Sequence, residues 1–298
     1  MRFCKFAGGL ALLVAGLGFL GAWHPALVSL SVFRLYAAGV LGGAAVLCVV
    51  SGARWRGAIW ALLGLAIWAS SGQMRPGHAP IAQAQKSTIL SHYQKNVLFN
   101  TQGLSLIVND ILEAQADSVS LQEVSQAHLE DLSALNATYP TQHKCLSKAF
   151  GGTVVLSRFE ALSEGICLDA SRAAAIQVAG PEGPFWVVSV HLFWPWPRSQ
   201  AAQLERLVPE LAKLDGPKVI SGDFNMVPWG EPIGEIAQAG QVALLAPRPV
   251  TLVQFGGVLR VPIDLILVTG GEGAVERRAR LGSDHFGLLA RYRLARSD

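Results

Sequence analysis

Acidic residues are absent from the first third of this 298-residue sequence, because the first aspartate or glutamate of the chain is Asp110. Charged residues of both signs make up only 15% of the chain, whereas 51% of its residues are hydrophobic. Such a composition excludes an intrinsically disordered protein. Four cysteines are too few for a small scaffold held together by disulfides. The sequence also contains no internal repeat and no low-complexity tract.

The net charge of +3 conceals two parts of opposite sign. Residues 1–109 contain eight lysines and arginines and have a net charge of +8, so residues 110–298 have a net charge of −5. Nucleic-acid binding usually relies on a basic surface that neutralises phosphates. The acidic balance of the second part therefore counts against a nucleic-acid-binding protein of that kind.

Three uncharged, apolar segments fill most of the basic part: residues 6–23, 35–50 and 57–71. As a helix, the first would be about 27 Å long, close to the ~30 Å hydrocarbon core of a bilayer. Tryptophans, which favour membrane interfaces, flank the short third segment. We predict that residues 1–72 form a membrane anchor with about three transmembrane helices. A buried helical hairpin is the alternative, and a cleaved signal sequence would explain only the first segment.

Basic residues between these segments predict the topology. Arg2 and Lys5 precede the first segment, and Arg54 and Arg56 separate the second from the third, so both pairs are expected in the cytoplasm. Residues 73–86, with their prolines and glycine, read as a linker. The remaining residues, 87–298, would then form a catalytic domain on the extracytoplasmic side of the inner or plasma membrane.

An extracytoplasmic location bears on two of the cysteines, Cys145 and Cys167. In an oxidising compartment they either form a disulfide or remain buried free thiols that act as small apolar residues. Their spacing in the sequence does not decide between these alternatives.

The second part of the chain alternates short apolar runs with amphipathic helical segments. The predicted strands are 96–99, 118–121, 153–156, 185–192, 218–220, 263–268 and 286–294, and the predicted helices are 104–115 and 200–214. This alternation predicts an α/β domain of about 210 residues, which is within the size of a single hydrophobic core.

Eight polar residues adjoin or interrupt these apolar runs: Asn100, Glu123, His191, Asp223, Asn225, Asp264, Asp284 and His285. A single buried carboxylate would most often be a cap or a hydrogen-bonded core group. Four carboxylates, two amides and two histidines near strand ends instead predict one shared polar centre, which a hard divalent cation would stabilise. The other histidines, among them His92, are interpreted as surface or interfacial residues.

Seven short segments that contain these residues resemble, in their order along the chain, the endonuclease/exonuclease/phosphatase superfamily with its deoxyribonuclease-like fold. They are Val-Leu-Phe-Asn at 97–100, Leu-Gln-Glu-Val at 121–124, Leu-Ser-Arg at 156–158, Ser-Val-His-Leu at 189–192, Gly-Asp-Phe-Asn at 222–225, Ile-Asp-Leu-Ile at 263–266 and Ser-Asp-His at 283–285. The resemblance covers residues 95–294 and points to a membrane-anchored, bacterial-type member. It implies a four-layer sandwich of two face-to-face mixed β-sheets flanked by helices, here preceded by N-terminal transmembrane helices.

The resemblance also implies a hydrolase that uses Mg²⁺ or Mn²⁺ to cleave a phosphodiester or phosphoanhydride bond with an activated water. Glu123 would be the main metal ligand, with Asn100 and Asp284 completing or orienting the shell of the ion. The metal would polarise a phosphoryl oxygen and offset the negative charge that develops in the transition state.

The remaining residues of the set would act on the water and the phosphoryl group. By the same resemblance, Asp223 is the general base that takes a proton from the attacking water, and Asn225 holds water or phosphate by its amide. His285, oriented by Asp264, would donate to a phosphate oxygen, and His191 would contact the phosphoryl group from another side.

Two features of the sequence bear on the substrate. Some nucleases of the superfamily place a tyrosine seven residues before the serine of Leu-Ser-Arg, where this chain has Phe150. Aromatic residues at 193–197, together with Trp229, either reach a bilayer surface or pack on their own domain. We expect a membrane phosphoesterase that acts on a phosphorylated lipid or envelope-related phosphoester. The alternatives are an extracytoplasmic nuclease and a catalytically silent tethered domain that binds a partner.

Overall fold

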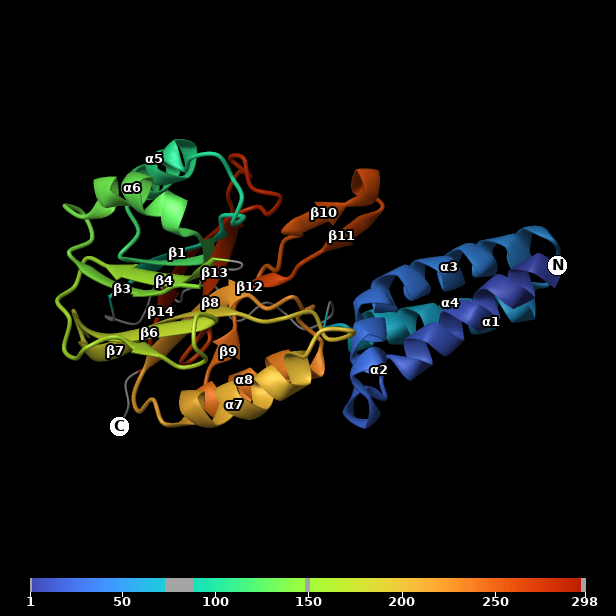
Figure 1. Cartoon of the computed structure of the whole chain (residues 1–298). Coiled ribbons are helices and arrows are strands. Elements are labelled where there is room, and N and C mark those ends of the chain that lie inside the picture. Colours follow the sequence, from blue (N-terminus) through green and yellow to red (C-terminus); the bar gives the residue numbers. More distant parts are fainter. Residues whose placement is uncertain (1, 73–87, 148–150, 296–298) are drawn as a thin grey trace. The chain divides into compact units, whose positions relative to one another are not determined.

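The computed structural model describes residues 2–72, 88–147 and 151–295 (Figure 1). The predicted linker at 73–86 and Phe150 lie outside these residues. The chain divides into two compact units. The helical unit contains Met1–Pro76, Trp194–Ala201 and Met226–Gly234, and the sheet unit contains the rest.

The helical unit consists mainly of α1 (Arg2–Leu17), α2 (Pro25–Leu30), α3 (Arg34–Val50) and α4 (Arg54–Ser70). Small residues bring these helices together, as is typical of helix packing within membranes. Ala11, Ala15 and Ala37 belong to one buried cluster. At Gly57 an added Cβ would lie 2.9 Å from the carbonyl oxygen of Ala45, so only glycine permits the close approach of α4 to α3.

One helical segment of the described chain, Pro25–Val50, is long and apolar enough to cross a membrane, judged by length and composition. The structure therefore does not support the prediction of about three transmembrane helices. α1 and α4 have 16 and 17 residues, short of the ~20 that a span requires. The predicted segment 6–23 is not one helix, because α1 ends at Leu17 and a separate turn of 3₁₀ helix follows at Gly21–Trp23.

The sheet unit contains two six-stranded sheets. In the first sheet the strand order is β13 (Glu272–Arg277), β14 (Leu288–Arg293), β1 (Leu90–Asn96), β2 (Ser118–Val124), β4 (Gly152–Ser157) and β3 (Thr141–Cys145). In the second sheet it is β5 (Ile166–Cys167), β6 (Ala173–Gly180), β7 (Gly183–His191), β8 (Lys218–Asp223), β12 (Asp264–Val268) and β9 (Ala243–Leu244). Both sheets are mixed, since β1 pairs with β2 and β7 with β8 in parallel, whereas the other pairs are antiparallel. A separate ribbon is formed by β10 (Leu252–Gln254) and β11 (Leu259–Val261).

The two sheets pack face to face around a buried apolar cluster that includes Val155, Ile176 and Ile266. Helices α5 (Ser105–Ala114) and α6 (Leu129–Leu132) cover the outer side of the first sheet, and α7 (Gln200–Ala212) and α8 (Glu231–Gly240) lie on the outer side of the second (Figure 1). The helical periodicity predicted for 200–214 is confirmed, because its apolar positions are buried. The predicted α/β fold with two mixed sheets and flanking helices is therefore correct.

The prediction of the first strand was wrong. The expected strand 96–99 lies at the end of β1 and beyond it, because β1 runs from Leu90 to Asn96. Its residues His92, Gln94 and Asn96 are polar and fully buried, so β1 has no apolar run to reveal it. Seven further strands were not predicted from the sequence: β3, β5, β6, β9, β10, β11 and β13.

Cys145 on β3 and Cys167 on β5 form a disulfide. Of the two alternatives that the sequence left open, the structure therefore has the bonded pair.

Candidate active site

The topology of the two sheets gathers the predicted polar residues at one end of the sandwich. Asn96 ends β1 and pairs with Gln122 of the parallel strand β2, so Glu123 follows next to it. In the second sheet His191 of β7 is in register with Asp223 of β8. Asp264, the first residue of the antiparallel strand β12, is also in register with Asp223. Five strands from both sheets thus bring polar side chains to one place.

Asp223 lies at the centre of this group and is almost completely buried. Its carboxylate accepts a hydrogen bond of 2.9 Å from Nδ2 of Asn96 and another of 2.9 Å from the backbone N–H of Asn225. Burial raises the pKa of Asp223 to about 7, against the opposing effect of the His285 charge. A carboxylate with a pKa near neutrality is well suited to accept a proton from water.

Gly222, which precedes Asp223, is required by the close approach of β8 to β7. Its φ of 155° lies in a region that L side chains rarely adopt, and an added Cβ would lie 1.8 Å from the carbonyl oxygen of Val190. The glycine of the Gly-Asp-Phe-Asn segment therefore sets the position of the following aspartate.

His285 is held as a cation by carboxylates on two sides. Its Nδ1 lies 2.8 Å from Oδ2 of Asp264, and its Nε2 lies 3.7 Å from Oδ2 of Asp223. Burial lowers the pKa of His285, but Asp264 and Asp223 outweigh this effect and raise it to about 10. The Nε2–H of His285 is therefore a positively charged donor at neutral pH.

His191 has the opposite character. The guanidinium of Arg172 lies 2.9 Å from Nδ1 of His191, and because arginine can only donate, Nδ1 accepts and the ring proton is on Nε2. Burial lowers the pKa of His191 well below its usual value, and the charges of Arg172 and His285 lower it further. Its neutral Nε2–H lies 3.7 Å from Oε1 of Glu123 and 3.7 Å from Oδ2 of Asp223. The site thus holds one neutral and one charged imidazole.

Glu123 is positioned by an irregularity in β2. The pairing of β2 with β4 shifts register between Leu121 and Val124, and Glu123 itself has a left-handed backbone with φ of 60°. Such a conformation costs a non-glycine residue about 1–3 kcal/mol and occurs most often at functional sites. Its two oxygens accept hydrogen bonds from Nδ2 of Asn96 (3.0 Å) and from the backbone N–H of Phe99 (3.0 Å).

Asn96, rather than the predicted Asn100, is the asparagine that the structure brings into the site. Asn96 is buried and donates to both Glu123 and Asp223. Asn100 is exposed in the turn four residues later. The predicted strand 96–99 placed Asn100 just after its end, whereas β1 ends at Asn96.

Asn225 has a left-handed backbone with φ of 47° and is buried beside Asp223. Its side-chain amide donates to the carbonyl oxygen of Leu192 at 2.8 Å. The structure therefore places Asn225 in the site, where it ties the chain after β8 to the chain after β7.

The donor set fits a hard divalent cation. Oδ1 of Asp284 is buried and has no hydrogen-bond partner within the described part of the chain, while its other oxygen accepts from Gln254 at 3.3 Å. A buried carboxylate oxygen without a partner is costly, and a bound cation removes that cost. A carboxylate oxygen of Glu123 and one of Asp223 lie within 4.8 Å of each other. Glu123 and Asp284 carry carboxylate oxygens, the kind of ligand that Mg²⁺ and Mn²⁺ prefer.

One face of β1 forms what we call the polar seam, namely His92, Gln94 and Asn96. Each of these alternate residues reaches the second sheet: Nε2 of His92 lies 2.6 Å from Oγ of Ser221, Gln94 donates to Asp264 at 2.9 Å, and Asn96 donates to Asp223 at 2.9 Å. Burial lowers the pKa of His92 to about 3, so its ring is neutral. The interpretation of His92 as a surface or interfacial residue was therefore wrong.

Lys95, on the opposite face of β1, ties down the chain segment that carries Asp284 and His285. It is fully buried, and its ammonium donates to the carbonyl oxygens of Ala279 (3.0 Å), Arg280 (2.7 Å) and His285 (2.7 Å). Burial lowers its pKa to about 8. Sequence reasoning missed both Lys95 and Arg172, because neither belongs to a motif and their roles depend on tertiary contacts.

The aromatic residues predicted to lie near the site have different environments. Trp194 and Trp196 are exposed. Trp229, within the helical unit, donates its indole N–H to the carbonyl oxygen of Ser31 at 2.8 Å.

Comparisons with known proteins agree with this geometry. The profile of the "Endonuclease/Exonuclease/phosphatase family" matches residues 94–285. No curated protein matches the sequence. Similar solved structures include a protein of this family from Leptotrichia buccalis, with 15% identity and a TM-score of 0.56, covering 69% of this chain and 100% of its own.

Two further structures have names that state an activity. Sphingomyelinase C from Streptomyces griseocarneus has 15% identity and a TM-score of 0.52, with 69% of this chain and 100% of that chain covered. An AP endonuclease from Archaeoglobus fulgidus has 16% identity and a TM-score of 0.54, with 68% of this chain and 99% of that chain covered. At these identities the likeness concerns the fold.

Proposed function

The chain belongs to the endonuclease/exonuclease/phosphatase family and is a hydrolase of phosphoester bonds, and from this premise we propose that it acts on a lipid or envelope-related phosphoester at a membrane. Members of this family depend on divalent metal ions, and we propose Mg²⁺ or Mn²⁺ here. Its structural neighbours include a sphingomyelinase and an AP endonuclease, so the fold leaves the substrate open. The choice of a membrane substrate therefore rests on features of this chain.

The observation that carries the proposal is the apolar tip of the β10–β11 ribbon. Phe255 and Val258, in the turn between its strands, are 79% and 74% exposed. The ribbon adjoins the site, because Leu252 at its base forms a β-bridge with His285 and Gln254, at the other end of β10, donates to Asp284. An exposed aromatic and a β-branched residue at such a tip favour contact with acyl chains.

The helical unit supports the same proposal. Its helices expose large apolar side chains, among them Phe6, Val50 and Leu62, which water would solvate poorly and lipid would solvate well. We propose that this unit anchors the chain in the membrane and that the sheet unit lies on the extracytoplasmic side. A disulfide in the sheet unit fits that location, since disulfides persist in oxidising compartments.

The site supplies the groups that a hydrolysis by activated water needs. Asp223, with its pKa raised to about 7, takes a proton from the attacking water. His285 donates its charged Nε2–H to a phosphoryl oxygen, and Asp264 maintains that charge. His191 donates a neutral Nε2–H from another side. A divalent cation held by Glu123 and Asp284 would polarise a phosphoryl oxygen and offset the charge of the transition state.

A substrate panel tests this proposal on the full chain in detergent with Mg²⁺. We expect release of phosphate or a phosphorylated head group from lipid phosphoesters in mixed micelles, and no release by Asp223→Ala. Release of nothing from any lipid phosphoester, together with efficient degradation of DNA, would refute the proposal in favour of the nuclease. If neither the wild-type chain nor Asp223→Ala hydrolyses lipid phosphoesters or DNA, the result would favour a silent binding domain.

The ribbon permits a sharper comparison. Replacing Phe255 and Val258 by serine is expected to lower kcat/KM on lipid in bilayers and to leave the hydrolysis of a soluble, short-chain phosphodiester unchanged. Val253→Ser is the matched control. Val253 lies on the same ribbon, but it is half-buried and lies outside the exposed tip. Equal losses on both substrates would show that the tip serves the site rather than the membrane.

A further inference from the structure

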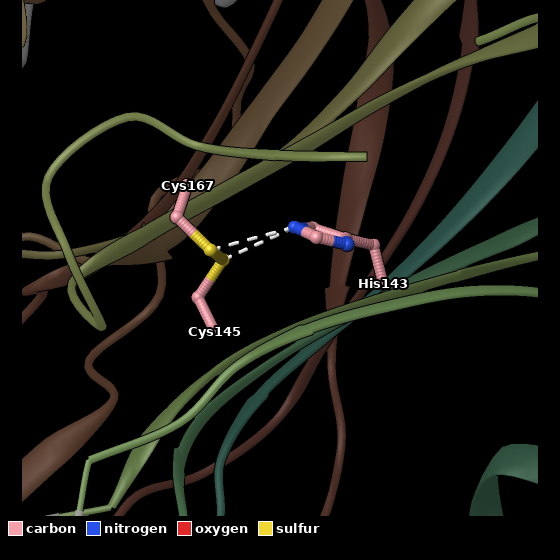
Figure 2. Close-up of side chains that lie close together, drawn as sticks. All are labelled: His143, Cys145 and Cys167. Carbon is pink, nitrogen blue, oxygen red and sulfur yellow. Dashed lines mark hydrogen bonds between the residues drawn. A yellow bond between two sulfur atoms is a disulfide. The ribbon is translucent and has the colours of Figure 1, made fainter. Parts of the chain in front are cut away.

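A second cluster of metal-binding side chains lies outside the active site. His143 and Cys145, two residues apart on β3, point to the same face of that strand, where they meet Cys167 of β5 (Figure 2). Nε2 of His143 lies 3.2 Å from Sγ of Cys145 and 3.5 Å from Sγ of Cys167. We call these three residues the cysteine–histidine cluster.

The cluster joins the two sheets at their edges. β3 is the outermost strand of the first sheet and β5 is the outermost strand of the second. The strands that carry the active site, β1, β2, β7, β8 and β12, belong to the middle of the sheets. The reaction at Asp223 does not use this cluster, so its composition calls for a separate explanation.

We propose that the cysteine–histidine cluster is a redox-controlled metal site, closed as a disulfide and able to bind a borderline or soft ion such as Zn²⁺ or Cu⁺ when reduced. Two thiolates and an imidazole are the ligands that these ions prefer. Around a tetrahedral Zn²⁺, bond lengths of ~2.3 Å to sulfur and ~2.0 Å to nitrogen place ligand nitrogen and sulfur about 3.5 Å apart. The nitrogen–sulfur distances of 3.2 and 3.5 Å already agree with that arrangement.

The imidazole is held in place independently of the sulfurs. At Gly165 in the connection to β5, an added Cβ would lie 2.1 Å from Cγ of His143, so the ring packs directly on the backbone of that glycine. The two Cα atoms of the cysteines are 5.8 Å apart. After reduction the sulfurs therefore need to separate by only about 2 Å for each to ligate one tetrahedral ion.

The sulfurs differ in access, which sets the order of the reduction. Cys167 is exposed, whereas Cys145 is buried. A thiolate of an external dithiol attacks Sγ of Cys167, and the sulfur of Cys145 leaves as a thiolate beside Nε2 of His143. The second thiolate of the reductant then attacks its own sulfur in the mixed disulfide and releases Cys167. Two electrons and two protons pass from the dithiol to the protein, and an incoming M²⁺ later displaces the two thiol protons.

Cobalt spectroscopy on the full chain in detergent tests this proposal. Cys4→Ser and Cys48→Ser first remove the other two thiols. The protein is reduced with a dithiol, desalted without oxygen and titrated with Co²⁺. We expect thiolate-to-cobalt charge-transfer absorption that saturates at one equivalent, disappears when Zn²⁺ is added, and is absent from the oxidised protein. Cobalt bound by oxygen ligands in the active site gives no such absorption.

Single substitutions then identify the ligands. Loss of an outer-shell partner weakens a metal site about 10–100-fold, and loss of the His143 ligand in His143→Gln should weaken Co²⁺ binding at least as much. Cys167→Ser should remove most of the thiolate absorption. Lys144 lies between the two β3 ligands, points to the opposite face of the strand and is exposed. The control variant Lys144→Gln should therefore leave Co²⁺ binding unchanged.

The proposal fails if the reduced protein shows no thiolate absorption with Co²⁺, or if His143→Gln binds Co²⁺ as tightly as Lys144→Gln does. X-ray absorption of the Zn²⁺-loaded chain keeps the test decisive if a variant does not fold. Two sulfur ligands and one imidazole are expected, and a shell of oxygen ligands alone would overturn the assignment.

Discussion

Replacing Asp264 by asparagine tests the charge state on which the proposed reaction depends. Asp264 contacts Nδ1 of His285 with one oxygen and accepts from Gln94 with the other, at 2.8 and 2.9 Å. Asparagine has the same shape, and if its oxygen keeps the contact with Gln94, its N–H₂ faces Nδ1 of His285. That nitrogen must then accept, so the ring is neutral with its proton on Nε2.

The size of the effect follows from the pKa of His285. The carboxylates raise this pKa from its ordinary value of 6.5 to about 10, even though burial acts against them. At about 1.4 kcal/mol per unit, that rise corresponds to about 5 kcal/mol, supplied mainly by Asp264 and Asp223. Without the Asp264 charge the burial remains, so the pKa of His285 should fall. A general acid or charged donor typically contributes about 10²–10⁴-fold, and kcat at pH 8 should fall within that range.

The pH dependence of kcat/KM is the assay. In the wild-type enzyme the acidic limb follows the protonation of Asp223, whose pKa is about 7 before a metal lowers it, and the basic limb follows the deprotonation of His285 near pH 10. Asp264→Asn should move the basic limb toward neutral pH. Asp215→Asn, the same change at an exposed aspartate, is the control. A basic limb that stays near pH 10 in Asp264→Asn would refute the role assigned to His285.

Three further predictions concern the metal, a buried lysine and the disulfide. Glu123→Gln should weaken activation by Mg²⁺ at least tenfold, and EDTA should abolish activity that Mg²⁺ restores. Lys95→Met should lower kcat several-fold and the free energy of unfolding by about 3 kcal/mol, because it leaves buried carbonyl oxygens near His285 without a donor. Replacing Cys145 and Cys167 by alanine should lower the free energy of unfolding by about 3 kcal/mol without changing kcat.

Each of these predictions has a result that contradicts it. Mg²⁺ activation that is unchanged in Glu123→Gln would remove that residue from the metal shell. Lys144→Met is the control for Lys95→Met, and similar losses of kcat in both variants would mean that the buried hydrogen bonds do not matter. A melting temperature that is insensitive to the loss of both cysteines would show that the link between the sheet edges contributes little to stability.

Most of the site could be predicted from the sequence because its residues stand at the ends of apolar strands. His191 and Asp223 end the strands β7 and β8, Asp264 begins β12, and Glu123 lies near the end of β2; each of these strands contains apolar residues that mark it in the sequence. The order of these segments was enough to predict the family and the two-sheet fold.

The predictions that were wrong concern residues whose contacts are made with distant parts of the chain. β1 reads as Leu-Ser-His-Tyr-Gln-Lys-Asn, which has no apolar run. Its buried polar residues are stabilised by hydrogen bonds to Ser221, Asp264 and Asp223 of the second sheet, and a single sequence does not show that pairing. The same reason explains the choice of Asn100 over Asn96.

The polar seam also determines the chemistry of the site. An apolar strand in place of β1 would pack against the second sheet at least as well, since burying polar groups costs free energy. It would, however, remove the amide of Asn96 from Asp223, and that hydrogen bond lowers the pKa of Asp223 against the effect of burial. A more basic, protonated Asp223 could not accept a proton from water at neutral pH. The buried polar face of β1 is therefore best explained by its effect on Asp223, whose carboxylate it keeps ionisable. Asn96→Leu should accordingly move the acidic limb of the pH dependence of kcat/KM to higher pH.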